Sequence, residues 1–174
     1  YKYLGKNTII FAISSFGTKV LTFLLVPLYT NVLTTEEYGT ADLITTTATL
    51  LMFVFTINIA SSVLRFTLDR QEQGSNILSY GCRVLVIGTC ICGIILGIVY
   101  KTNLLKWPKI NYIFVLLYFF ATAFYEIMTN YLRAIDRVKA VAIAGIISST
   151  IILVGNVVLL VIIKAGITGY LISI

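Results

Sequence analysis

Long apolar segments separated by short polar connections run along the whole chain. They predict five complete membrane-spanning helices and the start of a sixth, at about residues 7–33, 39–64, 78–100, 111–132, 140–163 and 166–174. Each complete segment supplies the roughly 20 residues that cross about 30 Å of hydrocarbon. Backbone groups in lipid must bond to one another, so helices are the expected structure. The predicted fold class is therefore all-α, a polytopic transmembrane helix bundle.

The composition agrees with an integral membrane protein. Of the 174 residues, 59% are hydrophobic and 11% are charged, whereas soluble domains have about 25% charged residues. The mean hydropathy is +0.97. The polar connections are too short to hold a soluble or catalytic domain. Because the chain begins at Tyr1 rather than at a methionine and stops inside an apolar run, we expect it to be an N-terminal fragment of a larger protein.

The placement of the positive charges predicts the orientation in the membrane. With a cytoplasmic N-terminus, eight cations fall on the inner side, at Lys2, Lys6, Arg65, Arg70, Arg83, Arg133, Arg137 and Lys139. The outer side carries four, at Lys101, Lys106, Lys109 and Lys164. Cytoplasmic connections carry the excess of Lys and Arg, so we expect the N-terminus inside. The net charge of +6 is then explained by the orientation of the chain in the membrane, and no nucleic-acid partner is expected.

Three predicted spans carry a stripe of polar residues along one side. The stripes are Ser15, Lys19, Thr22 and Thr30 in the first span, Asp42, Thr45, Thr46, Thr49 and Thr56 in the second, and Tyr112, Thr122, Glu126, Asn130 and Arg133 in the fourth. An ionisable side chain at the bilayer centre costs at least about 2.5–3.5 kcal/mol, so it needs compensation or a function. We expect Lys19, Asp42 and Glu126 to line one shared cavity. Thr22, Thr49 and Asn130 are expected beside them.

A purely structural alternative accounts for part of this pattern. Lys19 and Glu126 would form a buried ion pair that only fixes helix packing. The threonines would donate to carbonyls of their own helices. Asp42 lies near an outer helix end, where its charge could simply favour the helix N-terminus. A wettable path explains the additional Ser, Thr and Asn side chains better than a simple ion pair does.

Two further features concern helix shape and packing. Pro27 lacks a backbone donor and should bend the first span. Thr89, Gly93 and Gly97 are spaced by four residues and predict a close helix contact of the third span. The cysteines of that span, Cys82, Cys90 and Cys92, are expected to be small packing residues rather than a disulfide or metal site.

Catalytic signatures do not occur in the sequence. The chain has no His, and it lacks a phosphate-binding loop, a nucleophile elbow and metal-ligand spacing. We therefore predict that the protein is not an enzyme and that it uses no metal or other cofactor.

Several short motifs resemble one family when they are taken in order. They are P-L-Y-T-N-V-L at residues 27–33, E-Y-G at 37–39, A-x-x-x-x-R-F at 60–66 and L-R-A-I-D-R-V-K at 132–139. Their order and spacing resemble the opening of bacterial polysaccharide or oligosaccharide flippases. These flippases belong to the multidrug, oligosaccharidyl-lipid and polysaccharide exporter superfamily. The resemblance covers essentially the whole chain.

The resemblance implies an architecture and an activity. Such proteins have two six-helix bundles that face each other across a central cavity, so residues 1–174 would be a partial N-terminal transmembrane lobe. They move polyprenyl-pyrophosphate-linked oligosaccharide from the inner to the outer leaflet by alternating access, usually coupled to an H⁺ or Na⁺ gradient. The expected location is the bacterial cytoplasmic membrane. The expected partners are the lipid-linked saccharide, membrane lipids and other polysaccharide assembly proteins.

The same resemblance implies roles for charged residues. The stretch T-K-V-L at 18–21 is similar to a segment of peptidoglycan-precursor flippases in which an arginine is thought to meet the substrate pyrophosphate. Lys19 stands at the arginine position, although lysine is a point charge rather than a bidentate fork. We expect Lys19 to attract a diphosphate, and Glu126 to balance Lys19 or to take up a coupling proton. Arg65 and Arg133 could hold lipid phosphates at the cytoplasmic leaflet, or only set the orientation.

A multidrug and toxin exporter of the same superfamily is the main alternative. Such exporters typically bind organic cations, which the positive charge of Lys19 would repel. A structural or interaction protein is the alternative from another class, and its polar stripes would stay dry.

Overall fold

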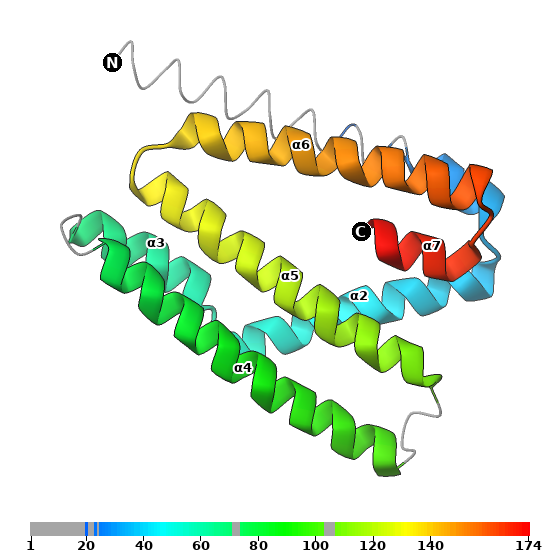
Figure 1. Ribbon diagram of the computed structural model, residues 1–174, viewed down its shortest axis with the longest axis horizontal. Coiled ribbons are helices and arrows are strands. Elements are labelled where there is room, and N and C mark those ends of the chain that lie inside the picture. Colours follow the sequence, from blue (N-terminus) through cyan, green and yellow to red (C-terminus); the bar gives the residue numbers. More distant parts are fainter. Residues whose placement is uncertain (1–19, 21–22, 24, 71–73, 103–106) are drawn as a thin grey trace. The chain divides into compact units, whose positions relative to one another are not determined.

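The computed structural model describes residues 20, 23, 25–70, 74–102 and 107–174. These residues form helices and short connections, with no strand among them. A helix over residues 25–32 precedes the elements labelled in Figure 1. In chain order these are α2 (Thr35–Thr56), α3 (Ile59–Asp69), α4 (Gly74–Thr102), α5 (Lys109–Ala134), α6 (Val138–Asn156), the π-helical segment η2 (Val157–Ile162) and α7 (Gly166–Ser173).

Four helical segments of the described chain are long and apolar enough to cross a membrane. They are Thr35–Thr56, Gly74–Thr102, Lys109–Ala134 and Val138–Ile162. Large apolar side chains of α4 point outward, with Ile87 and Ile98 each 58% exposed and Ile94 64% exposed. A continuous apolar surface of this kind requires a hydrocarbon solvent. The all-helical, membrane-spanning class predicted from the sequence is therefore confirmed for the described residues.

The second predicted span differs from its prediction. The single helix expected over residues 39–64 is corrected to two helices, α2 and α3, which are separated at Ile57 and Asn58. Both residues adopt left-handed backbone angles, with φ of 49° and 51°. Asn tolerates this region, but a β-branched residue such as Ile rarely enters it. The local sequence contains no Gly or Pro, so Asn58 is the one residue whose type is compatible with the break.

The described chain divides into two compact units. One comprises residues up to Asp42 together with Arg137–Ile174, and the other comprises Leu43–Asp136. In the first unit, the buried side chains of Leu25, Tyr29 and Leu33 form a core with Leu160 of η2. Tyr170 of α7 meets Tyr29 edge to face, with 4.7 Å between ring centroids. Apolar and aromatic packing thus joins the 25–32 helix to η2 and α7.

A capping box at the start of α2 adds polar contacts to the same unit. The backbone N–H of Thr34 donates to Glu37 Oε2 at 2.9 Å, and the N–H of Glu37 donates to Thr34 Oγ1 at 3.2 Å. This reciprocal pair satisfies two donors at a helix N-terminus. The backbone N–H of Ile167 also donates to Glu37. One carboxylate therefore binds the first turns of both α2 and α7, and the E-Y-G motif gains a structural role.

The second unit is built by α3, α4 and α5, which pack on one another. Gly74, Gly81 and Gly88 of α4 are all buried and recur every seven residues. A Cβ atom added to Gly81 would lie 2.7 Å from Val63 Cγ2, and one added to Gly88 would lie 2.7 Å from the carbonyl oxygen of Phe55. These glycines allow α4 to lie directly against α3 and against the end of α2.

The close contact of α4 does not use the predicted ladder of Thr89, Gly93 and Gly97. A Cβ at Gly97 would meet no atom within 4 Å, and one at Gly93 would reach only Leu116 at ordinary contact distances of 3.6 and 3.8 Å. The prediction of a small-residue ladder in this helix is therefore corrected to Gly74, Gly81 and Gly88. A spacing of four residues identifies a possible helix face, but the neighbouring helix decides which face is covered.

The glycine contacts give a first testable prediction. Gly88→Ala should destabilise the protein by about 1–3 kcal/mol, because the new methyl group must displace the Phe55 backbone. Gly97→Ala, in open space on the same helix, should leave stability unchanged or raise it slightly through helix propensity. Thermal unfolding of the purified protein in detergent measures both. Equal stability of the two variants would contradict the close packing at Gly88.

The capping box gives a second prediction. Glu37→Ala should cost about 0.5–2 kcal/mol, the usual range for losing a helix cap. Glu36→Ala removes a neighbouring carboxylate that lies outside the pair of Thr34 and Glu37 and should cost less. Chemical unfolding of both variants in detergent compares them. A Glu36→Ala variant that is the less stable of the two would overturn the role of Glu37.

Candidate functional site

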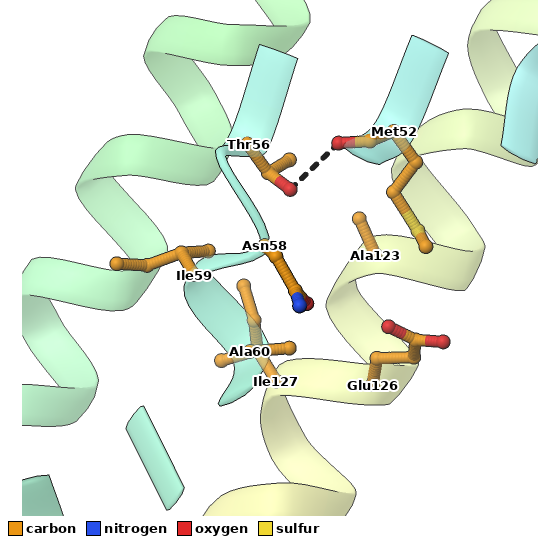
Figure 2. Close-up of a pocket in the computed structure, with 8 residues that line it drawn as sticks. All are labelled: Met52, Thr56, Asn58, Ile59, Ala60, Ala123, Glu126 and Ile127. Carbon is orange, nitrogen blue, oxygen red and sulfur yellow. Dashed lines mark hydrogen bonds between the residues drawn. The ribbon is translucent and has the colours of Figure 1, made fainter. Parts of the chain in front are cut away.

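A pocket lies where α2 breaks and meets α5 (Figure 2). Its lining comes from the end of α2, the start of α3 and one face of α5. The lining residues are Met52, Thr56, Asn58, Ile59, Ala60, Ala123, Glu126 and Ile127. All of them belong to the second unit, so one compact body builds the pocket.

The break leaves backbone groups without their usual helical partners, and several local hydrogen bonds form around it. Helix ends expose their last carbonyls and first N–H groups. At the start of α3, the N–H of Ser61 donates to the Asn58 carbonyl at 3.2 Å, and Ser61 Oγ donates to Asn58 Oδ1 at 3.1 Å. At the end of α2, Thr56 Oγ1 donates to the Met52 carbonyl at 2.7 Å. The break is thus an ordered turn with its own hydrogen bonds.

Among the described residues that line the pocket, Glu126 is the only ionisable one. Its side chain is half-buried, and Figure 2 shows its carboxylate and the Asn58 amide both pointing into the pocket. The remaining lining is mostly apolar. A carboxylate inside a membrane-spanning helix is costly and is a default marker of a functional site. The pocket therefore combines one acidic group with one amide that can donate and accept hydrogen bonds.

The polar stripe of α5 continues beyond Glu126. Asn130, one turn further on, is half-buried, and Arg133 is exposed. Arg133 donates from its guanidinium to Asn130 Oδ1 at 3.2 Å. The stripe therefore ends in an amide and a cation at the C-terminal end of α5, where a positive charge complements the helix dipole.

Most threonine hydroxyls of the predicted polar stripes donate hydrogen bonds to backbone carbonyls of their own helices. Thr49 Oγ1 donates to the Thr45 carbonyl at 2.8 Å, and Thr122 Oγ1 donates to the Tyr118 carbonyl. Thr129 Oγ1 donates to the Tyr125 carbonyl at 2.9 Å. The purely structural alternative for the polar stripes predicts bonds of this kind, from threonine hydroxyls to carbonyls of the same helix. Each hydroxyl oxygen keeps acceptor capacity, so a role in a polar path stays a prediction.

None of the other predicted site residues within the described part of the chain lines this pocket. Asp42 is exposed on α2 within the first unit, and Arg65 is exposed on α3. Lys19 and Thr22 lie outside the described residues. The shared cavity of Lys19, Asp42 and Glu126 therefore stays a prediction, as does the ion pair of Lys19 with Glu126.

Sequence reasoning missed Asn58 as a site residue. It lies in an apolar run where Ile57 and Ile59 flank it, and it falls outside the polar stripe of the second span. The one available signal was its residue type, because Asn competes with helical hydrogen bonding and tolerates the left-handed region.

A family model identifies the protein family to which the chain is related. The model for polysaccharide biosynthesis proteins matches residues 4–174. The chain belongs to this family. The match agrees with the resemblance of the short motifs and covers nearly the whole sequence. No curated protein and no solved structure matches the chain.

Membership of the polysaccharide biosynthesis family agrees with the apolar helices of the structure. Its members are transporters and flippases rather than enzymes. The described residues provide several apolar helices of membrane-spanning length. The chain is therefore a multi-pass membrane protein of polysaccharide biosynthesis.

The left-handed turn gives a third prediction. Asn58→Gly should preserve the break, because glycine enters the left-handed region without a steric penalty. Asn58→Val should destabilise the protein by about 1–2 kcal/mol, because a β-branched side chain is disfavoured there. Thermal unfolding of the two variants in detergent compares them. An Asn58→Val protein as stable as Asn58→Gly would contradict the left-handed conformation.

Proposed function

We propose that the protein is a flippase that moves polyprenyl-pyrophosphate-linked oligosaccharide from the inner to the outer leaflet of the bacterial cytoplasmic membrane. The observation that carries this proposal is the match of the polysaccharide biosynthesis family to residues 4–174 of a chain rich in membrane-spanning helices. Transport proceeds by alternating access. The N-terminus is cytoplasmic, in keeping with the excess of Lys and Arg on that side.

The physical problem of such a substrate explains the polar residues inside the spans. A diphosphate and a hydrated sugar chain cannot enter hydrocarbon without losing most of their solvation. A flippase must therefore offer polar partners along a path through its helices. Glu126, Asn130 and Asn58 are polar residues of the described spans and their connection, and they support a path of this kind.

Individual residues take distinct parts in the proposal. Lys19 attracts the diphosphate, and Thr22, Thr49 and Asn130 line the sugar path with Asp42 near its outer end. Arg65 and Arg133 contact lipid or substrate phosphates at the cytoplasmic leaflet. Both arginines are exposed, as this role requires. Membrane lipids and other polysaccharide assembly proteins are the remaining partners.

The family match favours saccharide over organic cations as the cargo. A multidrug exporter of the same superfamily would need an interior that attracts positive charge, whereas this chain carries a lysine within its first span.

A fourth prediction tests the role of Lys19. In the intact protein, Lys19→Ala should lower surface polysaccharide about tenfold or more, because a charge-assisted contact to phosphate is lost. Lys19→Arg keeps the charge and should retain most of the export. Surface polysaccharide is measured in a strain that lacks the native gene, and membrane levels of each variant are compared by immunoblotting.

The matched control is Lys101→Ala, which removes an exposed cation at the end of α4 and should leave export unchanged. Full export by Lys19→Ala would remove the role assigned to Lys19. Reconstituted protein that moves no lipid-linked saccharide across vesicles would overturn the flippase proposal itself.

A further inference from the structure

Three aromatic rings pack together where α4 ends and α5 begins. The ring of Tyr112, in the first turn of α5, lies 5.6 Å from that of Tyr100 and 6.0 Å from that of Trp107, measured between centroids. Tyr112 is 7% exposed, whereas Tyr100 is 46% exposed and Trp107 is half-buried. One covered ring therefore supports two others that present part of their surface to an outside partner.

The rings belong to different elements of the second unit. Tyr100 lies in the last turn of α4, Trp107 lies in the connection, and Tyr112 lies in α5. An aromatic side chain that only anchors a helix at the membrane interface needs no other ring beside it. Because α4 and α5 pack on one another, the contacts between these rings hold them together as one platform. Small-molecule sites commonly combine such aromatic surface with a few polar groups that fix the orientation of the ligand.

Asn111 adds an amide beside the covered ring. It is 6% exposed, and its backbone N–H donates to the Pro108 carbonyl at 3.0 Å. Within the described part of the chain, its side-chain amide forms no hydrogen bond. A buried amide without a partner carries a desolvation cost. A hydroxyl group both donates and accepts, so the hydroxyls of a saccharide can satisfy both halves of this amide.

A positive charge stands at the same end of α5. The helix begins at Lys109 after Pro108, which provides no side-chain cap, and its first turn has no acidic residue. The N-terminal end of a helix attracts anions and disfavours cations. The exposed Lys109 thus adds a full positive charge where the helix end is already partly positive. An anionic ligand would remove this unfavourable interaction.

Two ordinary explanations of a surface lysine do not account for Lys109. Lys101 stands in the last turn of α4, where a cation complements the helix dipole, but Lys109 stands at the opposite kind of helix end. In the proposed orientation this end of α5 faces outward, where the positive-inside rule gives no reason for a cation. Lys109 is therefore best explained by a partner of negative charge.

We propose that the outer ends of α4 and α5 form a binding site for an acidic saccharide. The rings of Tyr100 and Trp107 pack against the C–H face of a sugar. Asn111 bonds to its hydroxyls, and Lys109 pairs with its carboxylate. The cargo of the proposed flippase is then a saccharide that carries acidic sugars, held here as it reaches the outer leaflet. This inference rests on the proposed function, because a saccharide is expected at this end only if the protein exports it.

The fluorescence of Trp107 provides a direct binding test on the intact protein in detergent. Adding trigalacturonate as the acidic probe should change the fluorescence saturably, and the Trp107→Phe variant should lack this change. Galactotriose, the neutral probe, should bind about threefold to tenfold more weakly, because it lacks the charged contact. A Trp107 signal that neither saccharide changes would overturn the site.

Two lysine variants test the charged contact with a matched control. Lys109→Gln should weaken binding of trigalacturonate about threefold to tenfold and leave binding of galactotriose unchanged. Lys101→Gln removes an exposed cation from the neighbouring helix end and should leave both affinities unchanged. Asn111→Ala should weaken both probes by a similar factor, because the amide meets hydroxyls that both of them carry. An equal loss of trigalacturonate binding in the two lysine variants would overturn the specific role of Lys109.

The possible results separate this inference from the proposed function. A Trp107 signal that phosphatidylglycerol produces and neither saccharide produces would assign the rings to the membrane interface and overturn the site. Transport of lipid-linked saccharide in reconstituted vesicles, without saccharide binding at Trp107, overturns the site and leaves the flippase intact. Saccharide binding at Trp107 in a protein that moves no lipid-linked saccharide supports the site and overturns the flippase.

Discussion

The need to satisfy every backbone hydrogen bond inside hydrocarbon is the constraint on which the described structure depends. It makes helices the default, and it makes any interruption of a helix expensive. The break between α2 and α3 interrupts the apolar stretch that the sequence predicts as one span, because Ile57 and Asn58 leave the helical conformation directly after Thr56. Local hydrogen bonds surround the break, from Ser61 Oγ to Asn58 Oδ1 and from Thr56 Oγ1 to the Met52 carbonyl.

Close packing supports the break from outside. The Phe55 carbonyl, just before the turn, lies where a side chain on Gly88 would have to be. Gly81 receives Val63 of α3 in the same way. In lipid, helices gain contact energy mainly by close approach of their backbones, which small residues allow. Thus the glycines of α4 leave room for Phe55 at the end of α2 and for Val63 of α3.

The polar residues of the spans divide into two groups once their partners are known. The hydroxyls of threonines such as Thr49 and Thr56 donate hydrogen bonds to backbone carbonyls of their own helices. The Glu126 carboxylate cannot donate to a carbonyl of its own helix, because a carboxylate only accepts hydrogen bonds and carries a full charge. Glu126 and Asn58, which lies at the break between α2 and α3, line the same pocket. This pocket of the second unit therefore lies at the point where its backbone is irregular.

The sequence by itself predicted the apolar spans that α2, α4, α5 and α6 occupy in the described structure, since each run is long enough to cross the bilayer. It also contains the T-x-x-E signature of the capping box at Thr34 and Glu37, because that signal acts within one helical turn. It marked Glu126 as costly, but it could not show what Glu126 faces. Only the tertiary structure decided the break at Ile57, the choice of Gly88 over Gly97 for close packing, and the placement of Asn58 and Glu126 in one pocket lining. Each depends on atoms from a segment distant in the chain, which local propensity and periodicity do not contain.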